Sequence, residues 1–384
     1  MSIIRSERSA AGLLLGAAVL GLVLANTALG PALFDLQAAV VGVPGTDIQL
    51  SLGHWVSDGL LAVFFFIVAV DLRHELAAGE LNSVRKALRP GIAALGGIVV
   101  PALVYLAIAA PSGYAGGWPI PTATDIAFAL GVLALFGRGL PNRIRVFLLA
   151  LAVLDDLVAI LIIAVFFTHA VDLGMLALGA VAVLAFALTG IALRGRLRAP
   201  VGVLMVLLAL LAWGFVLLSG VHATIAGVAL GLVMPRVPAR RVVHALEPWS
   251  NGLVLPLFAF SAALVAIPQV APSQLAPPFW AILVALPVGK LVGITLGGWL
   301  GSFTVPREER RRLGLPGLAV IATLGGIGFT VSLLMNELAF ARRPEVADEG
   351  TLAVLLGSSV ALAASAIVVS AVARRHRRRV HPRE

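Results

Sequence analysis

The sequence predicts an all-α protein that crosses a membrane about twelve times. Of its 384 residues, 60% are hydrophobic and only 12% are charged, and the mean hydropathy is +1.03; an ordinary soluble domain is about one quarter charged. The apolar residues form runs of about 20, the length that a helix needs to cross the hydrocarbon core. We therefore expect one transmembrane domain over residues 1–384, with a short basic tail from about residue 374.

Twelve apolar runs follow one another along the chain. The first, after Arg5 and Arg8, resembles a signal peptide, but it is too long for one and leads into further spans, so we interpret it as a retained helix. The stretch 201–234 would be about 50 Å long as a single helix, so we divide it at Ser219-Gly220. The predicted spans are about 11–29, 56–70 (continuing toward 78), 91–109, 117–136, 144–168, 173–193, 201–218, 220–234, 252–267, 279–300, 316–340 and 351–373.

Basic residues set the predicted orientation. With both termini in the cytoplasm, every Lys and Arg falls on an inward segment except Lys290, Arg342 and Arg343, as the positive-inside rule requires. This distribution accounts for the net charge of +9 without a nucleic-acid partner. The basic tail is expected to contact anionic membrane lipid. The absence of cysteine excludes disulfides and thiolate metal sites.

The first outward loop contains a possible hairpin. Residues 47–52, Asp-Ile-Gln-Leu-Ser-Leu, alternate polar and apolar side chains after Val43-Pro44-Gly45, a pattern typical of a short strand. An irregular loop is an equally good interpretation.

Two predicted spans are interrupted. Span 4 has Pro121 and Thr124 beside Asp125, and span 11 has three glycines between 325 and 328. In the predicted topology, spans 3–5 and 10–12 run in opposite directions, each with a broken middle helix. We therefore expect inverted-topology repeats whose half-helix ends meet at an ion site. Simple helix packing is the alternative explanation for isolated Gly and Pro.

Asp155 and Asp156 lie in the middle of span 5. Charged side chains at that depth are costly and usually functional. Two neighbouring carboxylates cannot both ionise easily, so the pair can hold either a proton or a hard cation such as Na⁺ or Li⁺. The alternative is a structural ion pair with Lys290.

Lys290 and Asp125 are the other ionisable residues deep in apolar segments. Lys290 is one of only two lysines, and a desolvated Lys can lose its proton whereas Arg cannot; it is either a titrating group or a fixed counter-ion. Asp125 follows the break in span 4, where it could offset a helix dipole or bind the cation directly. Thr124 adds a hydroxyl for helix capping or ion ligation.

A second cluster of titratable residues is predicted at the cytoplasmic face. His244 and Glu247 in the loop between spans 8 and 9 could form a cluster that responds to pH, together with Asp71, His74 and Glu75 at the inner end of span 2. A solvated surface is the alternative. Because the sequence contains no phosphate-binding glycine loop, serine nucleophile elbow or His-rich metal spacing, we expect a transporter that needs no cofactor.

Five segments make the chain resemble the NhaA family of bacterial Na⁺/H⁺ antiporters. They begin at Pro121, Phe147, Ser219, Pro256 and Gly325, and their sequences are PTATDIAFALGVLAL, FLLALAVLDD, SGVHATIAG, PLFAF and GGIGFT. The resemblance implies an inner-membrane protein that expels Na⁺ or Li⁺ for a larger number of protons, driven by the proton-motive force. Inverted repeats are themselves a known feature of that family.

The resemblance also implies roles for individual residues. Asp156 would be the principal cation ligand, and Asp155 would pair with Lys290 until the transport cycle frees it. Asp125 and Thr124 would lie where the broken helices cross, with Asp125 and Lys290 balancing the half-helix dipoles. The hairpin in the first loop would contribute to a homodimer.

The cytoplasmic face departs from the family pattern. The family's loop before span 9 typically reads Glu-His-x-x-His-Pro-Trp, whereas this chain has Val-His-Ala-Leu-Glu-Pro-Trp from Val243. His74 replaces the usual basic residue before Glu75, and Asp71 is shorter than the common Glu. These changes concern pH activation rather than ion exchange.

Two other function classes are weighed against exchange. An intramembrane aspartyl protease also uses two membrane aspartates, but on separate helices, whereas Asp155 and Asp156 are adjacent. A symporter or channel could share the inverted-repeat scaffold, and the direction in which a Na⁺ pulse moves protons distinguishes it.

Overall fold

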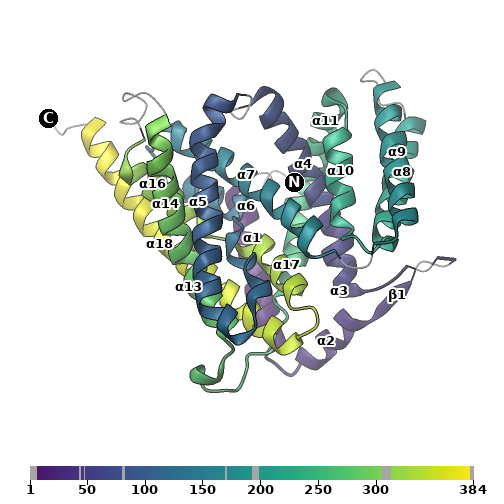
Figure 1. Ribbon diagram of the computed structural model, residues 1–384, viewed down its shortest axis with the longest axis horizontal. Coiled ribbons are helices and arrows are strands. Elements are labelled where there is room, and N and C mark those ends of the chain that lie inside the picture. The colour runs from purple at the N-terminus through teal and green to yellow at the C-terminus, as the bar shows by residue number, and fades with distance from the viewer. Residues whose placement is uncertain are drawn as a thin grey trace. The chain divides into compact units, whose positions relative to one another are not determined.

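The computed structural model describes residues 7–42, 45–46, 48–79, 83–168, 171–192, 199–304 and 313–380 (Figure 1). Most of this part of the chain is helical, and its strands form one two-stranded sheet. The all-α prediction is therefore confirmed. The helices pack into two units, which are described separately.

Unit 1 contains Leu13–Ala77 and Ile160–Leu264. Its core joins apolar side chains such as Ile67, Phe186, Leu230 and Val243 from four different helices. Its elements are α1 (Glu7–Ala25, in this unit from Leu13), α2 (Gly30–Ala38), β1 (Val40–Gly42), β2 (Gln49–Ser51), α3 (Leu52–His54), η2 (Trp55–Leu60), α4 (Leu61–Ala78), the end of α7 from Ile160, α8 (Leu173–Ala192), α9 (Ala199–Leu218), α10 (Thr224–Val233), α11 (Arg236–Trp249), η6 (Ser250–Val254) and α12 (Leu255–Ala262).

The hairpin expected in the first outward loop is present. Strands β1 and β2 pair antiparallel, with Val40 opposite Ser51 and Val41 opposite Leu50. The Trp55 indole N–H donates to the Val41 carbonyl at 3.0 Å and joins the hairpin to η2. Of the residues that predicted it, Val43, Pro44 and Asp47 lie outside the described part of the chain.

Unit 2 contains the start of α1 up to Gly12, Ala78–Ala159 and the chain from Val265 onward. It holds every residue that the sequence predicts for the ion site. Its elements are α5 (Val84–Ala109), η3 (Ala110–Ser112), η4 (Ala115–Gly117), η5 (Ile120–Thr122), α6 (Ile126–Phe136), α7 (Asn142–Phe166, in this unit up to Ala159), η7 (Pro272–Gln274), α13 (Pro277–Val284), η8 (Ala285–Gly289), α14 (Lys290–Gly301), η9 (Ser302–Thr304), α16 (Leu315–Gly325), α17 (Phe329–Ala339) and α18 (Pro344–Val380).

Helices α5 and α14 meet backbone to backbone because glycine recurs at every fourth residue from Gly289 to Gly301. A Cβ placed on Gly293 would meet the Gly96 carbonyl, and one on Gly297 would lie 3.0 Å from the Cα of Ala93. Small residues at this spacing let membrane helices approach closely. The close approach encloses Lys290, which begins α14 directly after the π-helical turn η8 and is completely buried.

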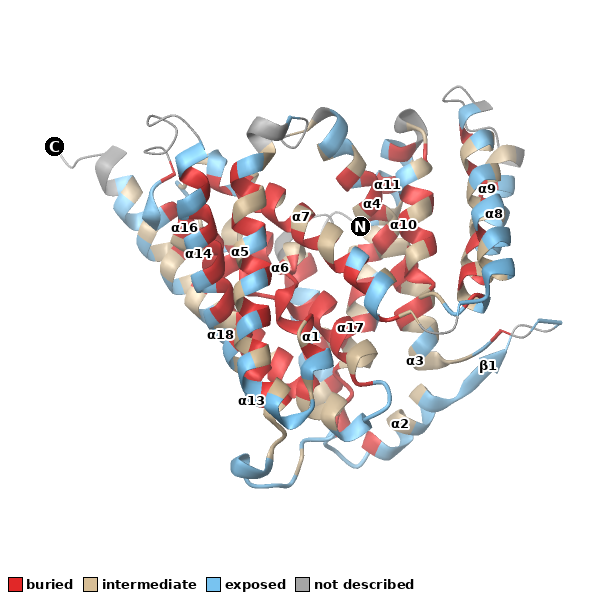
Figure 2. Ribbon diagram, viewed as in Figure 1, coloured by how far each residue is buried: buried red, intermediate tan, exposed pale blue. Residues whose placement is uncertain are grey.

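Both predicted interruptions are present in unit 2. Residues Ala123–Asp125 are non-helical between η5 and α6, and Gly326–Gly328 separate α16 from α17, which are bent by 47°. Figure 2 shows the two half-helices α16 and α17 largely in the colour of buried residues. The broken segments are therefore enclosed by the rest of the unit, as non-helical backbone at membrane depth must be.

Among the described residues, eight helices are long and apolar enough to span a membrane, or up to ten if each of two bent pairs forms one span. Ten of the twelve predicted spans correspond to these helices. The other two, 220–234 and 252–267, correspond to the short helix α10 and to the continuous α11, η6 and α12. The total of twelve and the inverted repeat remain predictions.

Candidate functional site

The two breaks in unit 2 lie against each other. The backbone N–H of Asp125 donates to the carbonyl of Ile327 at 2.6 Å. Across the same crossing, the Thr124 hydroxyl lies 3.0 Å from the carbonyl of Gly325, the last residue of α16. Each broken helix therefore supplies hydrogen-bonding partners that the other has lost, which is the condition for irregular backbone inside a membrane.

Asp125 caps two helices at once. One carboxylate oxygen, Oδ1, accepts from the backbone N–H of Phe128 in the first turn of α6 at 3.1 Å. The other, Oδ2, accepts from the backbone N–H of Thr330 at 3.2 Å and from its hydroxyl at 2.7 Å, at the start of α17. Because both helix starts carry partial positive charge, a carboxylate here balances two dipoles. This arrangement agrees with dipole compensation and leaves direct ligation of a cation unassigned.

Asp155, Lys290 and Thr124 form a buried triad. The Lys290 Nζ donates to Asp155 Oδ2 at 2.7 Å and to the Thr124 hydroxyl at 3.0 Å, and that hydroxyl lies 2.6 Å from the same Asp155 oxygen. Lys290 is 0% exposed and Asp155 is 2% exposed. Since the hydroxyl has one proton, it can serve either Asp155 or the Gly325 carbonyl at a given moment. Asp155 Oδ1 has no hydrogen-bonding partner within the described residues.

Asp156 differs from its neighbour in having no hydrogen bond to its side chain from the described part of the chain, although it is only 6% exposed. It lies within electrostatic range of Asp155, Asp125 and Lys290. Adjacent residues on a helix point about 100° apart, so Asp155 can face Lys290 while Asp156 faces another direction. A buried carboxylate without such partners is costly unless a proton or a cation neutralises it.

In unit 1 the structure brings the predicted pH-response residues of α4 and α11 into the same region. The carboxylate of Asp71 is within electrostatic range of Glu247 and Glu75, and Arg240 lies 3.3 Å from the Nε2 of His74. His244 and Glu247 are exposed on α11. The grouping exists, but whether it responds to pH is untested.

Sequence comparison then places the chain in a family. The sequence model of the family described as Na⁺/H⁺ antiporter 1 matches residues 1–369. The chain belongs to this Na⁺/H⁺ antiporter family.

Relatives from three organisms are similar over most of their length. The Na(+)/H(+) antiporter NhaA 2 of Clavibacter michiganensis subsp. michiganensis is 62% identical over 381 residues, covering 98% of this chain and 93% of the relative. Na(+)/H(+) antiporter NhaA of Tropheryma whipplei is 45% identical, covering 93% and 92%. Na(+)/H(+) antiporter NhaA of Mycolicibacterium smegmatis is 40% identical, covering 96% and 86%.

Membership of the antiporter family confirms the resemblance seen in the sequence motifs. Together with the apolar helices, it identifies a multi-pass membrane transporter rather than an enzyme. The protease interpretation is therefore wrong. The roles of individual residues are not tested by these similarities.

Sequence reasoning missed three polar contacts in this antiporter. Thr330 donates to Asp125, and its position two residues after Gly328 could have indicated a role in that crossing. In unit 1, the Oδ1 of Asp58 lies 3.6 Å from the Nδ1 of His222. The Trp213 indole N–H donates to the backbone carbonyl of Asp58 at 2.9 Å. Asp58 sits on the π-helical turn η2, which no feature of the sequence had marked.

Proposed function

We propose that this protein is a secondary antiporter that exports Na⁺ in exchange for protons, driven by the proton-motive force. The observation that carries the proposal is the buried group of Asp125, Asp155, Asp156, Thr124 and Lys290 around the crossing of two broken helices. Family membership supports Na⁺ and H⁺ as the transported ions. Cell pH and sodium homeostasis would be the physiological roles.

Asp156 is proposed as the principal ligand of the cation. It is buried and electrostatically coupled to three charged neighbours. A bound proton or a bound Na⁺ would each neutralise its carboxylate, and only one of them can occupy it. This mutual exclusion couples the two ion movements, because the site must release one ion before it takes up the other.

Asp155 is proposed as the second, conditional ligand. Its Oδ2 is held by Lys290 and Thr124 at 2.7 and 2.6 Å. Lys290 therefore keeps Asp155 from the cation until the pair separates. Because Lys290 and Asp155 carry opposite charges, they neutralise each other while the pair is closed. Separating the pair would free the negative charge of Asp155 to attract a cation.

The remaining parts of the proposal follow from the sequence pattern and the family. Li⁺ would share the Na⁺ site, because both are small hard cations. The protein would reside in the bacterial inner membrane with both termini in the cytoplasm, as the distribution of Lys and Arg predicts. The β1–β2 hairpin would contribute to a homodimer, and the basic end of α18 would contact membrane lipid. We propose no cofactor and no nucleic-acid partner.

The decisive experiment uses the purified protein in sealed proteoliposomes that contain a pH-sensitive dye. An imposed pH gradient should collapse when Na⁺ or Li⁺ is added, and K⁺ should have no effect. Protons moving in the same direction as Na⁺ would instead identify a symporter. Na⁺ flux without any proton movement would identify a channel, and either result would reject antiport.

A further inference from the structure

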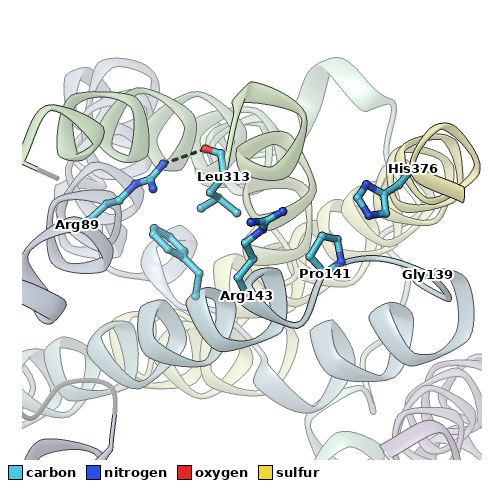
Figure 3. Close-up of a pocket in the computed structure, with 7 residues that line it drawn as sticks. Arg89, Gly139, Pro141, Arg143, Leu313 and His376 are labelled. Atoms are coloured by element: carbon cyan, nitrogen blue, oxygen red, sulfur yellow. Dashed lines mark hydrogen bonds between the residues drawn. The ribbon is translucent and has the colours of Figure 1, made fainter. Parts of the chain in front are cut away.

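A pocket of about 660 Å³ lies in unit 2 between the beginnings of α5 and α7 and the end of α18 (Figure 3). Its volume is within the range of about 300–1,000 Å³ that is common for small-ligand sites. It is separate from the ion site, since the two share no residue. Its lining residues are Arg89, Gly139, Pro141, Arg143, Phe147, Leu313 and His376.

Among the described residues that line this pocket, the polar side chains are all basic or potentially so. Figure 3 shows Arg89, Arg143 and His376 reaching the pocket from three different helices. Arg89 is 7% exposed; its guanidinium donates to the Leu313 carbonyl at 2.9 Å and lies 5.7 Å from the Phe147 ring centre. Arg143 is exposed in the first turn of α7, where the helix dipole adds positive potential. These three side chains, with no acid among the seven described lining residues, favour an anion in this part of the pocket.

The pocket lies near the ends of three candidate membrane spans, where lipid headgroups are expected. The three basic residues lie within two positions of the ends of candidate membrane spans, which are Ala87–Ser112, Asn142–Phe166 and Pro344–Arg377. The same pocket has apolar walls, because Phe147 and Leu313 are buried beside it. A ligand that combines a negative phosphate with an apolar portion fits both features better than a free ion does.

The end of α18 is packed onto the rest of this unit. Gly139 adopts a positive φ of +91°, and a Cβ there would lie 2.8 Å from the Cγ of Arg377. The turn before α7 is thus held against the last turns of α18. Any anion in the pocket would bind residues of α5, α7 and α18 together.

We propose that this pocket binds the phosphate headgroup of an anionic membrane phospholipid. The guanidinium groups of Arg89 and Arg143 are suited to phosphate, because their planar N–H groups can donate in pairs to its oxygens. His376 adds a third donor from the tail helix. The bound lipid joins three helix ends and stabilises unit 2.

The test compares two double variants of the full-length protein. R143Q/H376Q removes two pocket groups, whereas the control R374Q/R375Q removes two exposed arginines of α18 that do not line the pocket. Each protein is loaded in detergent with dioleoylphosphatidylglycerol or dioleoylphosphatidylcholine. Native mass spectrometry then measures the lipid retained, and a thermal melt measures stabilisation.

Wild type and the control should retain phosphatidylglycerol in preference to phosphatidylcholine and melt at a higher temperature with it. In R143Q/H376Q the ratio of retained phosphatidylglycerol to retained phosphatidylcholine should fall by about five-fold or more. Each basic side chain near a membrane surface contributes roughly that factor to the binding of anionic lipid. Na⁺/H⁺ exchange in phosphatidylcholine vesicles should remain in both variants, which separates this site from the ion site.

Equal lipid retention by R143Q/H376Q and wild type would overturn the proposal. A larger loss in R374Q/R375Q would also overturn it, because general surface attraction would then explain binding. If inorganic phosphate displaced the lipid and produced the same stabilisation, the occupant would be a soluble anion instead.

Discussion

At the scale of single residues, the two neighbouring aspartates have different environments. Asp155 is tied to Lys290 and Thr124, whereas Asp156 has no hydrogen bond to its side chain within the described residues. Asp155 is the less available ligand for a transported cation, because the Lys290 ammonium group already holds it. Asp156 is the more available ligand. This difference is the structural basis for assigning the principal cation ligand to Asp156.

Replacing Asp156 by Asn should abolish exchange without unfolding the protein. An amide has nearly the same shape but cannot alternate between a proton and a cation. Na⁺-driven pH change in proteoliposomes measures the effect, and Asp35→Asn, on the exposed part of α2, serves as a control that keeps exchange. Activity near wild type in D156N would remove Asp156 from the proposed site.

Replacing Lys290 by Met should reduce stability more than ion selectivity. Removing one partner of a buried pair leaves the Asp155 carboxylate uncompensated, which costs about 3–5 kcal/mol. The unfolding midpoint of the purified protein measures this loss, and the double variant D155N/K290M should recover part of it. An unchanged midpoint together with lost transport would show that Lys290 carries a proton rather than serving as a structural counter-ion.

At the scale of elements, the crossing of the broken helices depends on short polar contacts between segments distant in the chain. Asp125 is the N-cap of α6, yet its Oδ2 accepts both the backbone N–H and the hydroxyl of Thr330 at the start of α17. In the same helix, the Ser332 hydroxyl donates to the Ile120 carbonyl at 2.7 Å. The two hydrogen bonds have the same length, and both hydroxyl side chains are buried. They differ in their acceptor, which is a carboxylate for Thr330 and a neutral carbonyl for Ser332.

Thr330→Val should therefore destabilise the protein more than Ser332→Ala. A hydrogen bond to a charged acceptor contributes about 1.5–3 kcal/mol, whereas one to a neutral carbonyl contributes about 1 kcal/mol. Thermal unfolding of both variants in the same detergent makes the comparison. Equal losses would mean that Asp125 carries no net charge in the folded protein.

The contact between α5 and α14 gives a second prediction for an element. Gly293→Ala places a methyl group against the Gly96 carbonyl and 3.0 Å from the Cβ of Val100, and overpacking of this kind costs about 1–3 kcal/mol. Gly16→Ala in α1 meets nothing within 4 Å and should be neutral or slightly stabilising through helix propensity. A thermal melt of each variant tests this; a harmless G293A would show that the two helices can separate freely.

At the scale of the whole molecule, the dependence of transport on pH has two possible origins. Protons can compete directly with Na⁺ at Asp155 and Asp156 in unit 2, or the group around Asp71 and Glu247 in unit 1 can act as a separate sensor. Competition needs only the site carboxylates. His244 and Glu247 lie on helix α11 rather than in the predicted loop, in a segment whose sequence departs from the family pattern. We therefore expect competition to dominate.

Direct competition predicts that raising Na⁺ shifts the acid limb of the activity profile to lower pH. For one competing proton the shift is up to about one pH unit for each tenfold rise in Na⁺. Exchange rates in proteoliposomes at several Na⁺ concentrations measure it, and H244Q/E247Q should retain the same Na⁺-dependent shift. An acid limb that is fixed at all Na⁺ concentrations but moved by H244Q/E247Q would establish a separate sensor.

Much of this protein could be predicted from the order of its residues. Runs of about 20 apolar residues predict membrane helices because no other regular structure satisfies its own backbone in lipid. Pro121 and the glycines from Gly325 predict the two breaks, and ionisable residues at membrane depth predict the site, because their burial is too costly to be incidental. The alternation from Ile48 onward indicated a hairpin, which the antiparallel pairing of β1 and β2 confirms.

Only the tertiary structure decided which of these residues meet. Asp125 and Thr330 are 205 positions apart, and Lys290 and Asp155 are 135 apart; hydrogen bonds act over about 3 Å, so sequence spacing cannot reveal such pairs. In the sequence, Thr330 stood out only as the last residue of the motif GGIGFT. Arg89 stood out only as one of the basic residues that set the predicted orientation. In the folded protein Thr330 donates to the buried Asp125 carboxylate, and Arg89 lines a basic pocket. The packing of the helices determines which side chains come into contact.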